Sequence, residues 1–163
     1  MRKVGLVMGS DSDLPILEPA IDMLRKLEIP FEVRVLSAHR TPGQAAAFAQ
    51  SAMENGFGVI IAAAGKAAHL AGAMAANSLL PVIGIPVQAS ALDGLDALLS
   101  TVQMPAGVPV ATVAINGAQN AAILAAQMLA LEDKTLFIKL AAQRGEMERV
   151  AAEKDQAVRE RYF

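Results

Sequence analysis

Short apolar runs alternate along the chain with longer stretches in which apolar residues recur at helical spacing. The apolar runs predict five strands, at residues 3–8, 31–36, 59–63, 82–85 and 109–114. The stretches between them predict helices at residues 14–27, 42–54, 67–77, 92–102 and 118–131. The third to fifth strands are almost wholly apolar, as strands buried on both faces are. The pattern therefore predicts a parallel sheet with helices on both faces.

The end of the chain has a different character. Residues 97–131 carry no charged side chain, whereas residues 132–163 are densely charged. Polar residues and prolines interrupt the uncharged stretch too often for a membrane-spanning helix, so we expect other subunits to cover part of its surface. Residues 133–161 predict an amphipathic helix with no strand after it. We expect one domain over residues 1–132 and a C-terminal helix over 133–163 that packs on that domain or on a neighbouring subunit.

Composition and charge argue against several classes of function. The net charge of −2, without a basic cluster, does not predict a nucleic-acid partner. The absence of cysteine excludes disulfides and cysteine-based zinc sites, and the two histidines have no carboxylate at ligand spacing, so no metal site is predicted. The acidic pairs Asp11/Asp13 and Asp93/Asp96 are typical of helix starts, the first through capping and the second as a solvated first turn. The apolar run after Met1 is too short for a signal peptide, which predicts a cytoplasmic protein without a membrane partner.

Polar residues gather where the first three predicted strands end. In a sheet with strand order 2-1-3-4-5, the loops after these strands lie side by side at the carboxyl edge, where ligands bind. The loops read Gly-Ser-Asp-Ser-Asp at 9–13, Ser-Ala-His-Arg-Thr-Pro at 37–42 and Ala-Gly-Lys-Ala-Ala-His at 64–69. They contain both histidines of the chain, several hydroxyl groups, one arginine and one lysine. This convergence predicts the functional site.

Each loop suits a particular chemistry, and each also has a purely structural alternative. The hydroxyl and backbone N–H groups of residues 9–13 suit an anion or a ribose, but they equally suit ordinary turn and capping interactions. Arg40 suits phosphate because its planar fork binds bidentately, and His39 suits proton transfer because imidazole changes charge near neutral pH. The alternative for this pair is an exposed turn. His69 lies among alanines, which is more typical of a core or helix-start histidine than of a ligand.

Several known binding motifs do not match. The pair Gly65-Lys66 is not a Walker A loop, because Ile60 and Ala67 stand where that motif needs glycine and serine or threonine. No Gly-x-Gly-x-x-Gly follows the first strand. A phospho-receiver domain needs an aspartate at the end of the third strand, where this chain has alanine at 62–64. A non-enzymatic, flavodoxin-like FMN or nucleotide-binding module remains an alternative, although no aromatic residue lies in the three loops to stack on a flavin.

Five motifs, read in order, resemble the class I N5-carboxyaminoimidazole ribonucleotide mutases, the catalytic-subunit family of phosphoribosylaminoimidazole carboxylase. They are Met-Gly-Ser-x-Ser-Asp (8–13), Ser-Ala-His-Arg-Thr-Pro (37–42), Ala-Ala-His-Leu-x-Gly (67–72), Pro-Val (86–87) and Gln-Met-Pro-x-Gly-x-Pro-Val-Ala-Thr (103–112). The resemblance runs from about residue 4 to residue 131. It implies an α/β, flavodoxin-like three-layer αβα sandwich with a central five-stranded parallel sheet in the order 2-1-3-4-5, an extra C-terminal helix, and assembly as a homo-octamer.

The resemblance also implies an activity. The chain would be an isomerase of de novo purine synthesis that converts N5-carboxyaminoimidazole ribonucleotide to 4-carboxy-5-aminoimidazole ribonucleotide by decarboxylation and recarboxylation. It would need neither a metal nor an organic cofactor. Its only partners would be this small-molecule substrate and other copies of the same chain.

The resemblance assigns roles position by position. His39 would be the catalytic acid and base. Phosphate, ribose, imidazole and carboxylate would be held by the three loops. The implied substrate-binding residues are Gly9, Ser10, Ser12, Asp13, Ser37, Ala38, Arg40, Gly65, Lys66, Ala67, His69 and Leu70, and no residue is assigned to a metal.

Two features bear on which member of the family the chain resembles. The related class II enzymes carboxylate aminoimidazole ribonucleotide directly with CO₂. They carry Ser-Ala-His-Lys in the second loop and an asparagine in the third. This chain has Arg40 and His69 instead, which favours class I. Direct carboxylation remains the alternative activity. The third loop departs from the commonest family pattern, because Ala63, Lys66 and Ala71 replace Gly, Gly and Pro. Lys66 adds a cation near the expected carboxylate, where it either aids binding or points to solvent.

Overall fold

A computed structural model describes residues 1–89 and 92–163 of the chain. Its strands form one parallel sheet in the order β2-β1-β3-β4-β5. The strands are β1 (Lys3–Met8), β2 (Phe31–Val35), β3 (Phe57–Gly65), β4 (Val82–Val87) and β5 (Ala111–Thr112). The helices are a 3₁₀ turn η1 (Asp11–Asp13) and α1 (Leu14–Lys26), α2 (Pro42–Ser51), α3 (Leu70–Ala76), α4 (Leu95–Val102), α5 (Ala118–Ala130) and α6 (Lys134–Tyr162). The flavodoxin-like three-layer fold and its strand order are as predicted.

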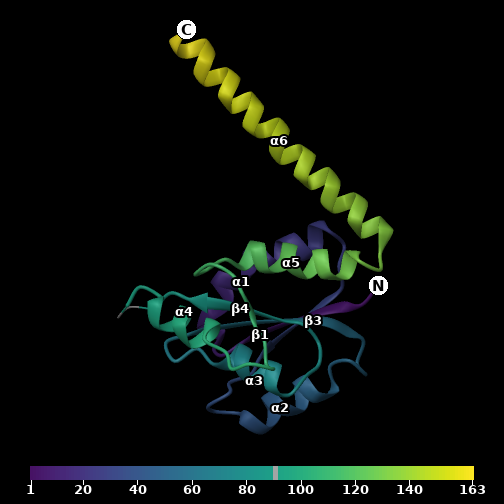
Figure 1. Cartoon of the computed structure of the whole chain (residues 1–163), viewed down its shortest axis with the longest axis vertical. Coiled ribbons are helices and arrows are strands. Elements are labelled where there is room, and N and C mark those ends of the chain that lie inside the picture. The colour runs from purple at the N-terminus through teal and green to yellow at the C-terminus, as the bar shows by residue number, and fades with distance from the viewer. Residues whose placement is uncertain (90–91) are drawn as a thin grey trace.

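The sheet separates two hydrophobic cores. Helices α1 and α5 pack together on one face, while α2, α3 and α4 cover the other (Figure 1). Successive residues of β1 point to opposite faces, so Leu6 and Met8 enter the core under α1 and α5, whereas Val7 enters the core under α2 and α3. In β3, Ile61 and Ile60 divide in the same way. Burial on both faces explains why the strands read as continuous apolar runs.

Several predicted boundaries are wrong for physical reasons. The third strand is longer than expected, because β3 is hydrogen-bonded to β1 and β4 on its two sides and the ladder continues to Gly65. The fourth strand was expected to end at residue 85, before Pro86, yet Pro86 lies inside β4 opposite Ala64 near the end of the ladder. The fifth strand keeps only Ala111–Thr112, because it is an edge strand paired on one side. Residues 67–69 form a turn before α3 rather than its first turn.

The last helix leaves the body of the molecule. It is capped by Asp133, whose carboxylate accepts a hydrogen bond from the N–H of Leu136 at 3.0 Å. Leu136 is fully buried against the core under α1 and α5, and Lys139 forms an ion pair with Glu28. Beyond these first turns α6 projects away from the sandwich (Figure 1). Within the described residues, no helix is long and apolar enough to cross a membrane.

Candidate functional site

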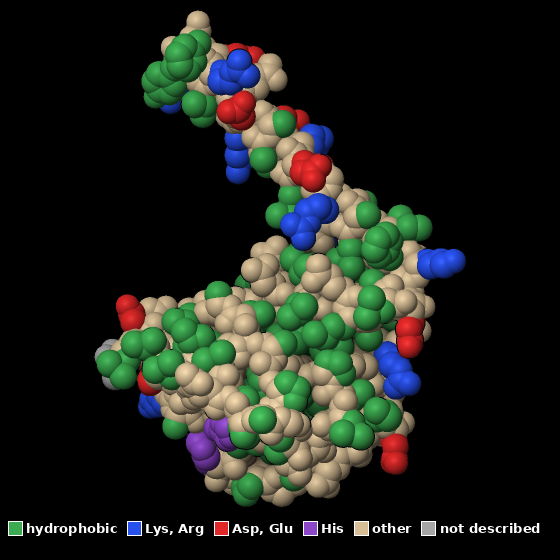
Figure 2. Space-filling view, in the orientation of Figure 1, with side chains coloured by type: hydrophobic (Ala, Val, Ile, Leu, Met, Phe, Trp, Pro, Cys, Tyr) green, Lys and Arg blue, Asp and Glu red, His purple; other side chains and the backbone are tan. Residues whose placement is uncertain are grey.

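A cleft of about 760 Å³ lies at the carboxyl ends of β1 to β4. Every residue that the sequence analysis assigned to the site lines it, from all three predicted loops: Gly9, Ser10, Ser12, Asp13, Ser37, Ala38, His39, Arg40, Gly65, Lys66, Ala67, His69 and Leu70. In Figure 2 histidine side chains (purple) lie together on the body, away from the projecting helix. The sheet order brings these loops together because β1, the central one of the three strands, has β2 and β3 as its neighbours.

The sequence analysis did not predict that a fourth loop, the one after β4, also lines the cleft. Val87, Gln88 and Ala89 follow β4 and line the cavity, as do Pro15 and Ile16 at the start of α1. The signal was available, since β4 is the next strand after β3 in the predicted order and its following loop must reach the same edge. No Phe, Tyr or Trp is among the described residues that line the cleft, so these residues offer a flavin no aromatic ring to stack on.

The first loop is shaped by its two serines. The hydroxyl of Ser10 accepts hydrogen bonds from the N–H of Ser12 at 3.3 Å and from its hydroxyl at 2.9 Å, and it donates to Asp11 at 3.2 Å. Ser10 therefore caps this turn. The prediction that Asp13 caps the first helix is wrong, because the Asp13 carboxylate makes no cap hydrogen bond to α1. Burial raises the pKa of Asp13 above its ordinary value, while the N–H of Ser10 and the nearby Arg40 act in the opposite direction. The Asp13 carboxylate is thus left for the cleft.

The second loop is closed by its own hydrogen bonds. Thr41 accepts from the N–H of Ser37 at 2.9 Å and donates from its hydroxyl to the Ser37 carbonyl at 3.1 Å. The Ser37 hydroxyl in turn accepts from the N–H of Arg40 at 3.1 Å. These bonds fix a tight turn with His39 exposed near its tip. The loop therefore presents the imidazole to the cleft without burying it.

Arg40 joins the second loop to the first. Its Nη2 donates to the carbonyl of Gly9 at 2.8 Å. A guanidinium has five N–H donors in a planar fork, so this single bond leaves most of the fork for an anion. Because the side chain is held at one end, the cleft gains a positioned positive charge at the junction of the two loops.

The third loop is held against α4. Gly65 pairs with Val87, and a β-carbon at position 65 would lie 3.3 Å from the Val87 carbonyl oxygen. Lys66 follows with a left-handed backbone, φ +58°. The carbonyl of Lys66 accepts from the N–H of Ala68 at 2.8 Å, and the Ala68 carbonyl accepts from the buried hydroxyl of Thr101 at 3.2 Å. The turn is thus fixed from both sides before α3 begins.

His69 is the N-cap residue of α3, at the end of the turn formed by residues 67–69. Its Nδ1 is 3.3 Å from the carbonyl oxygen of Ser100 on α4, and when Nδ1 donates this bond Nε2 is left as an acceptor. The imidazole lies so close over Gly72 that a β-carbon there would be 2.4 Å from the ring. The helix-start interpretation of His69 is confirmed, and the core interpretation is wrong because the side chain is exposed.

The second acidic pair is not the simple solvated turn that was expected. The Asp93 carboxylate accepts from the side-chain amide of Gln88 at 2.6 Å, and Gln88 also exchanges two hydrogen bonds with Asn116. One oxygen of Asp96 is buried and makes no hydrogen bond to any described residue. Over residues 1–89 and 92–163, no group of three histidine or acidic side chains is placed to hold a metal.

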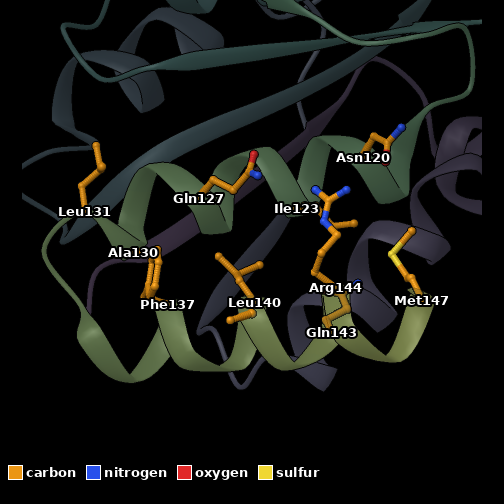
Figure 3. Close-up of a pocket in the computed structure, with 11 residues that line it drawn as sticks. Asn120, Ile123, Gln127, Ala130, Leu131, Phe137, Leu140, Gln143, Arg144 and Met147 are labelled. Carbon is orange, nitrogen blue, oxygen red and sulfur yellow. The ribbon is translucent and has the colours of Figure 1, made fainter. Parts of the chain in front are cut away.

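A second cavity lies between α5 and α6. It has a volume of about 460 Å³ and its lining is mainly apolar, with Arg144 as the one charged side chain among the described residues that line it. Figure 3 shows Phe137, Leu140 and Arg144 directed from α6 toward α5. We refer to this cavity as the α5–α6 groove. It contains none of the groups that the sequence analysis assigned to chemistry.

Comparison with known proteins identifies the family. The family model described as AIR carboxylase matches residues 3–150. The chain belongs to the AIR carboxylase family. The match reaches past residue 131 into α6, so it is longer than the resemblance found from the motifs alone.

Relatives in the AIR carboxylase family are named for two different activities. The chain is 52% identical over 149 residues to the N5-carboxyaminoimidazole ribonucleotide mutase of Pyrococcus abyssi, covering 91% of this chain and 86% of that protein. It is 55% identical over 137 residues to the phosphoribosylaminoimidazole carboxylase of Saccharomyces cerevisiae, covering 84% of this chain but 24% of that longer protein. The crystal structure of Treponema denticola PurE superposes with a TM-score of 0.84 at 25% identity, covering 94% of this chain and 96% of that one.

Proposed function

We propose that this protein is an N5-carboxyaminoimidazole ribonucleotide mutase that acts in de novo purine synthesis, in the cytoplasm. The observation that carries the proposal is the convergence of His39, Arg40 and Lys66 on one cleft in a chain that is 52% identical to a protein of that name. The cleft combines a titratable group with positive charges and hydroxyls, which suits a small anionic ribotide. Its lining residues carry no aromatic platform for a flavin.

The reaction moves one carboxylate between two atoms of the same molecule. The bond between the exocyclic nitrogen and the carboxyl carbon breaks, CO₂ is released, and the nitrogen takes up a proton. Carbon four of the imidazole then attacks CO₂, a carbon–carbon bond forms, and the ring proton at that carbon is lost. One proton is taken up and one is released, so a single group can serve both steps.

His39 is the group that we assign to this proton transfer. Its imidazole is exposed at the tip of a turn that its neighbours hold rigidly, and imidazole can donate and accept near neutral pH. In the protonated form it gives its proton to the departing nitrogen, and as neutral imidazole it later removes the proton from carbon four. The cleft keeps the released CO₂ beside the ring, so recapture competes with escape.

The substrate's phosphate and ribose are assigned to the first two loops. Arg40 and Ser37 bind phosphate, while Ser10, Ser12 and Asp13 hold the ribose and its phosphate. The small side chains of Ala64 and Ala67 leave space for a flat ring in the third loop. Apart from Ala64, these residues were all assigned to the site from the sequence, and the cleft that they line supports the assignment.

Direct carboxylation of aminoimidazole ribonucleotide by CO₂ is the second candidate. The observation in its favour is the 55% identity to the Saccharomyces cerevisiae carboxylase. That identity covers a quarter of a longer protein, whereas the mutase relative matches over most of its own length. The mutase is therefore the better supported activity.

The deciding experiment supplies freshly prepared N5-carboxyaminoimidazole ribonucleotide without added bicarbonate. Product formation by the natural protein, absent with a correctly folded His39→Asn variant, would establish the mutase and the role of His39. Product from aminoimidazole ribonucleotide only at high bicarbonate would establish the carboxylase instead. Lack of product in both assays would overturn the proposal.

We further propose that the chain assembles as a homo-octamer, in which the part of α6 that projects beyond its first turns packs on a neighbouring subunit. Support comes from apolar side chains that are roughly half exposed at helical spacing on and just before α4, namely Leu92, Leu95, Leu99 and Val102. The apolar α5–α6 groove and the projecting part of α6 offer further surface to cover.

Light scattering tests the assembly. Eight chains of 17.0 kDa each correspond to a mass of about 136 kDa. Leu99→Asp should lower that mass, because a carboxylate cannot be buried without a partner. Gln44→Asp, on the exposed start of α2, is the control that should leave it unchanged. A natural protein of 17 kDa in solution would contradict assembly.

A further inference from the structure

Among the described residues, only Lys66 combines a left-handed backbone with a charged side chain that has no partner within the chain. Four non-glycine residues there have a left-handed backbone: Glu28, Lys66, Asp93 and Asn116. A side chain in this conformation brings its β-carbon close to the next carbonyl, which costs roughly 1–2 kcal/mol and is borne more easily by Asn and Asp. A lysine gains no such local relief, so another interaction is expected to account for its presence.

The other three residues each use their side chains within the protein. Glu28 pairs with Lys139, and Asp93 and Asn116 are both hydrogen-bonded to Gln88. Lys66 alone of the four makes no side-chain hydrogen bond and no ion pair with any described residue. Its ammonium group is exposed, and it lines the cleft. Strained backbone around an unpaired charge is typical of a binding site.

The sheet places Lys66 and Arg40 on different sides of the cleft. Arg40 follows β2 and is bonded to the loop after β1, whereas Lys66 follows β3, next to the end of β4. Strand β1 lies between β2 and β3, and neighbouring strands are about 4.8 Å apart, so the two loops leave the sheet about 10 Å from one another. The cleft therefore has a positive group at each of two ends.

We propose that Lys66 is the residue that binds the substrate's carboxylate and so makes the cleft prefer carboxylated ribotides over aminoimidazole ribonucleotide. This inference rests on the proposed function. A ribotide with a phosphate at one end and a carboxylate at the other carries negative charge at both ends. Arg40 binds the phosphate, and Lys66 binds the carboxylate at the end where the described lining of the cleft contains no other lysine or arginine.

This role has a distinct kinetic signature. Both the substrate and the product carry the carboxylate, whereas the carboxylate charge is lost when CO₂ is free in the cleft. Lys66 therefore stabilises the two bound ribotides more than the intermediate between them, which is ground-state binding. Loss of the ammonium should raise KM without lowering kcat. A cation that acted on the reacting step would lower kcat instead.

The test compares Lys66→Met, Lys66→Arg and a control, Lys154→Met, which removes an exposed lysine of α6. Calorimetric titration measures Kd for 4-carboxy-5-aminoimidazole ribonucleotide and for aminoimidazole ribonucleotide, which lacks the carboxylate. We expect Lys66→Met to weaken the first about fivefold, the size of a favourable exposed ion pair, and the second less than about twofold. Lys66→Arg should retain most of the affinity, and Lys154→Met all of it.

The outcomes separate this inference from the proposed function. Equal weakening of both ligands, or no weakening of either, overturns the role of Lys66 while leaving the mutase intact. If the natural protein binds neither ribotide, the proposed function itself fails and the inference fails with it. Lys66→Gly provides a variant whose fold is secure, because glycine adopts the left-handed backbone without strain. It should show the same selective loss as Lys66→Met.

Discussion

The cleft and the α5–α6 groove are both large cavities, of about 760 and 460 Å³, but the chain builds them in opposite ways. The cleft is lined by four loops that are far apart in sequence and that carry most of the polar groups expected to do chemistry. The groove lies between two consecutive helices and is lined mainly by apolar side chains. Size alone therefore does not mark a site. The polar cavity suits a small anion, and the apolar one suits another protein surface.

The largest effect is expected in the cleft, at His39. Replacement by Asn keeps the size and polarity of the side chain but removes its ability to exchange a proton. We expect kcat to fall by about 10²–10⁴, the usual contribution of a general acid or base, while the melting temperature stays the same. Steady-state kinetics and thermal unfolding measure the two effects. A kcat within threefold of the natural protein would remove His39 from the proton transfer.

The attachment of α6, which forms one side of the groove, is tested at Leu136, a residue of α6 that is buried in the core rather than in the groove. Leu136→Ala leaves a cavity in the core under α1 and α5, and we expect it to lower the free energy of unfolding by about 2–5 kcal/mol. Urea unfolding measures the loss. The control is Ile138→Ala, two residues along the same helix, whose side chain is 67% exposed and should cost less than about 0.5 kcal/mol. Equal losses at both positions would mean that a neighbouring subunit covers Ile138.

Two glycine substitutions, Gly72→Ala beside the cleft and Gly145→Ala in α6, should affect activity and stability differently. In Gly72→Ala the new β-carbon would lie 2.4 Å from the His69 ring, so the exposed imidazole must move away from Ser100. We expect activity to fall on the order of tenfold, because a displacement of about 1 Å in a site is sufficient for such losses. Gly145→Ala, in α6 with no atom within 4 Å of its new methyl group, should instead raise stability by about 0.5–1 kcal/mol and leave activity unchanged. Kinetics and urea unfolding of the two variants give the contrast, and similar activities would place His69 outside the reaction.

The smallest effect is expected at Asp13. Its pKa is raised in the folded protein, chiefly by burial, so ionisation of this carboxyl costs stability at pH values above its folded pKa. Asp13→Asn should therefore unfold at a higher urea concentration than the natural protein at neutral pH, and this advantage should disappear as the pH falls into the ordinary range of an aspartic acid. Binding of the ribotide should weaken in the same variant. A gain in stability without a loss of binding would show that Asp13 has no part in the site.

Local sequence patterns were sufficient to predict most helices and strands of this protein and the three loops of the cleft. The alternation of apolar runs and helical spacing predicted the elements, and the strand order then placed the three loops at one edge. Residues such as His39 and Arg40 could be assigned because a loop after a parallel strand has only one edge of the sheet to reach. The errors at Pro86 and at residues 67–69 arose where pairing with neighbouring strands, rather than local preference, decides where an element ends.

Other features depend on contacts between distant segments. The sequence by itself determined the fold class, the three loops and the residue types that they present, because periodicity and chain direction specify these locally. Only the tertiary structure decided that Ser10 rather than Asp13 caps the first turn, and that Gln88 is hydrogen-bonded to Asn116 and Asp93. It also decided that Lys66 has a left-handed backbone and no partner for its charge among the described residues. The charge of Arg40 near Asp13, the bonds between Gln88 and Asn116, and the pairing of Gly65 with Val87 just before Lys66 all join segments that are distant in sequence, and no local pattern encodes them.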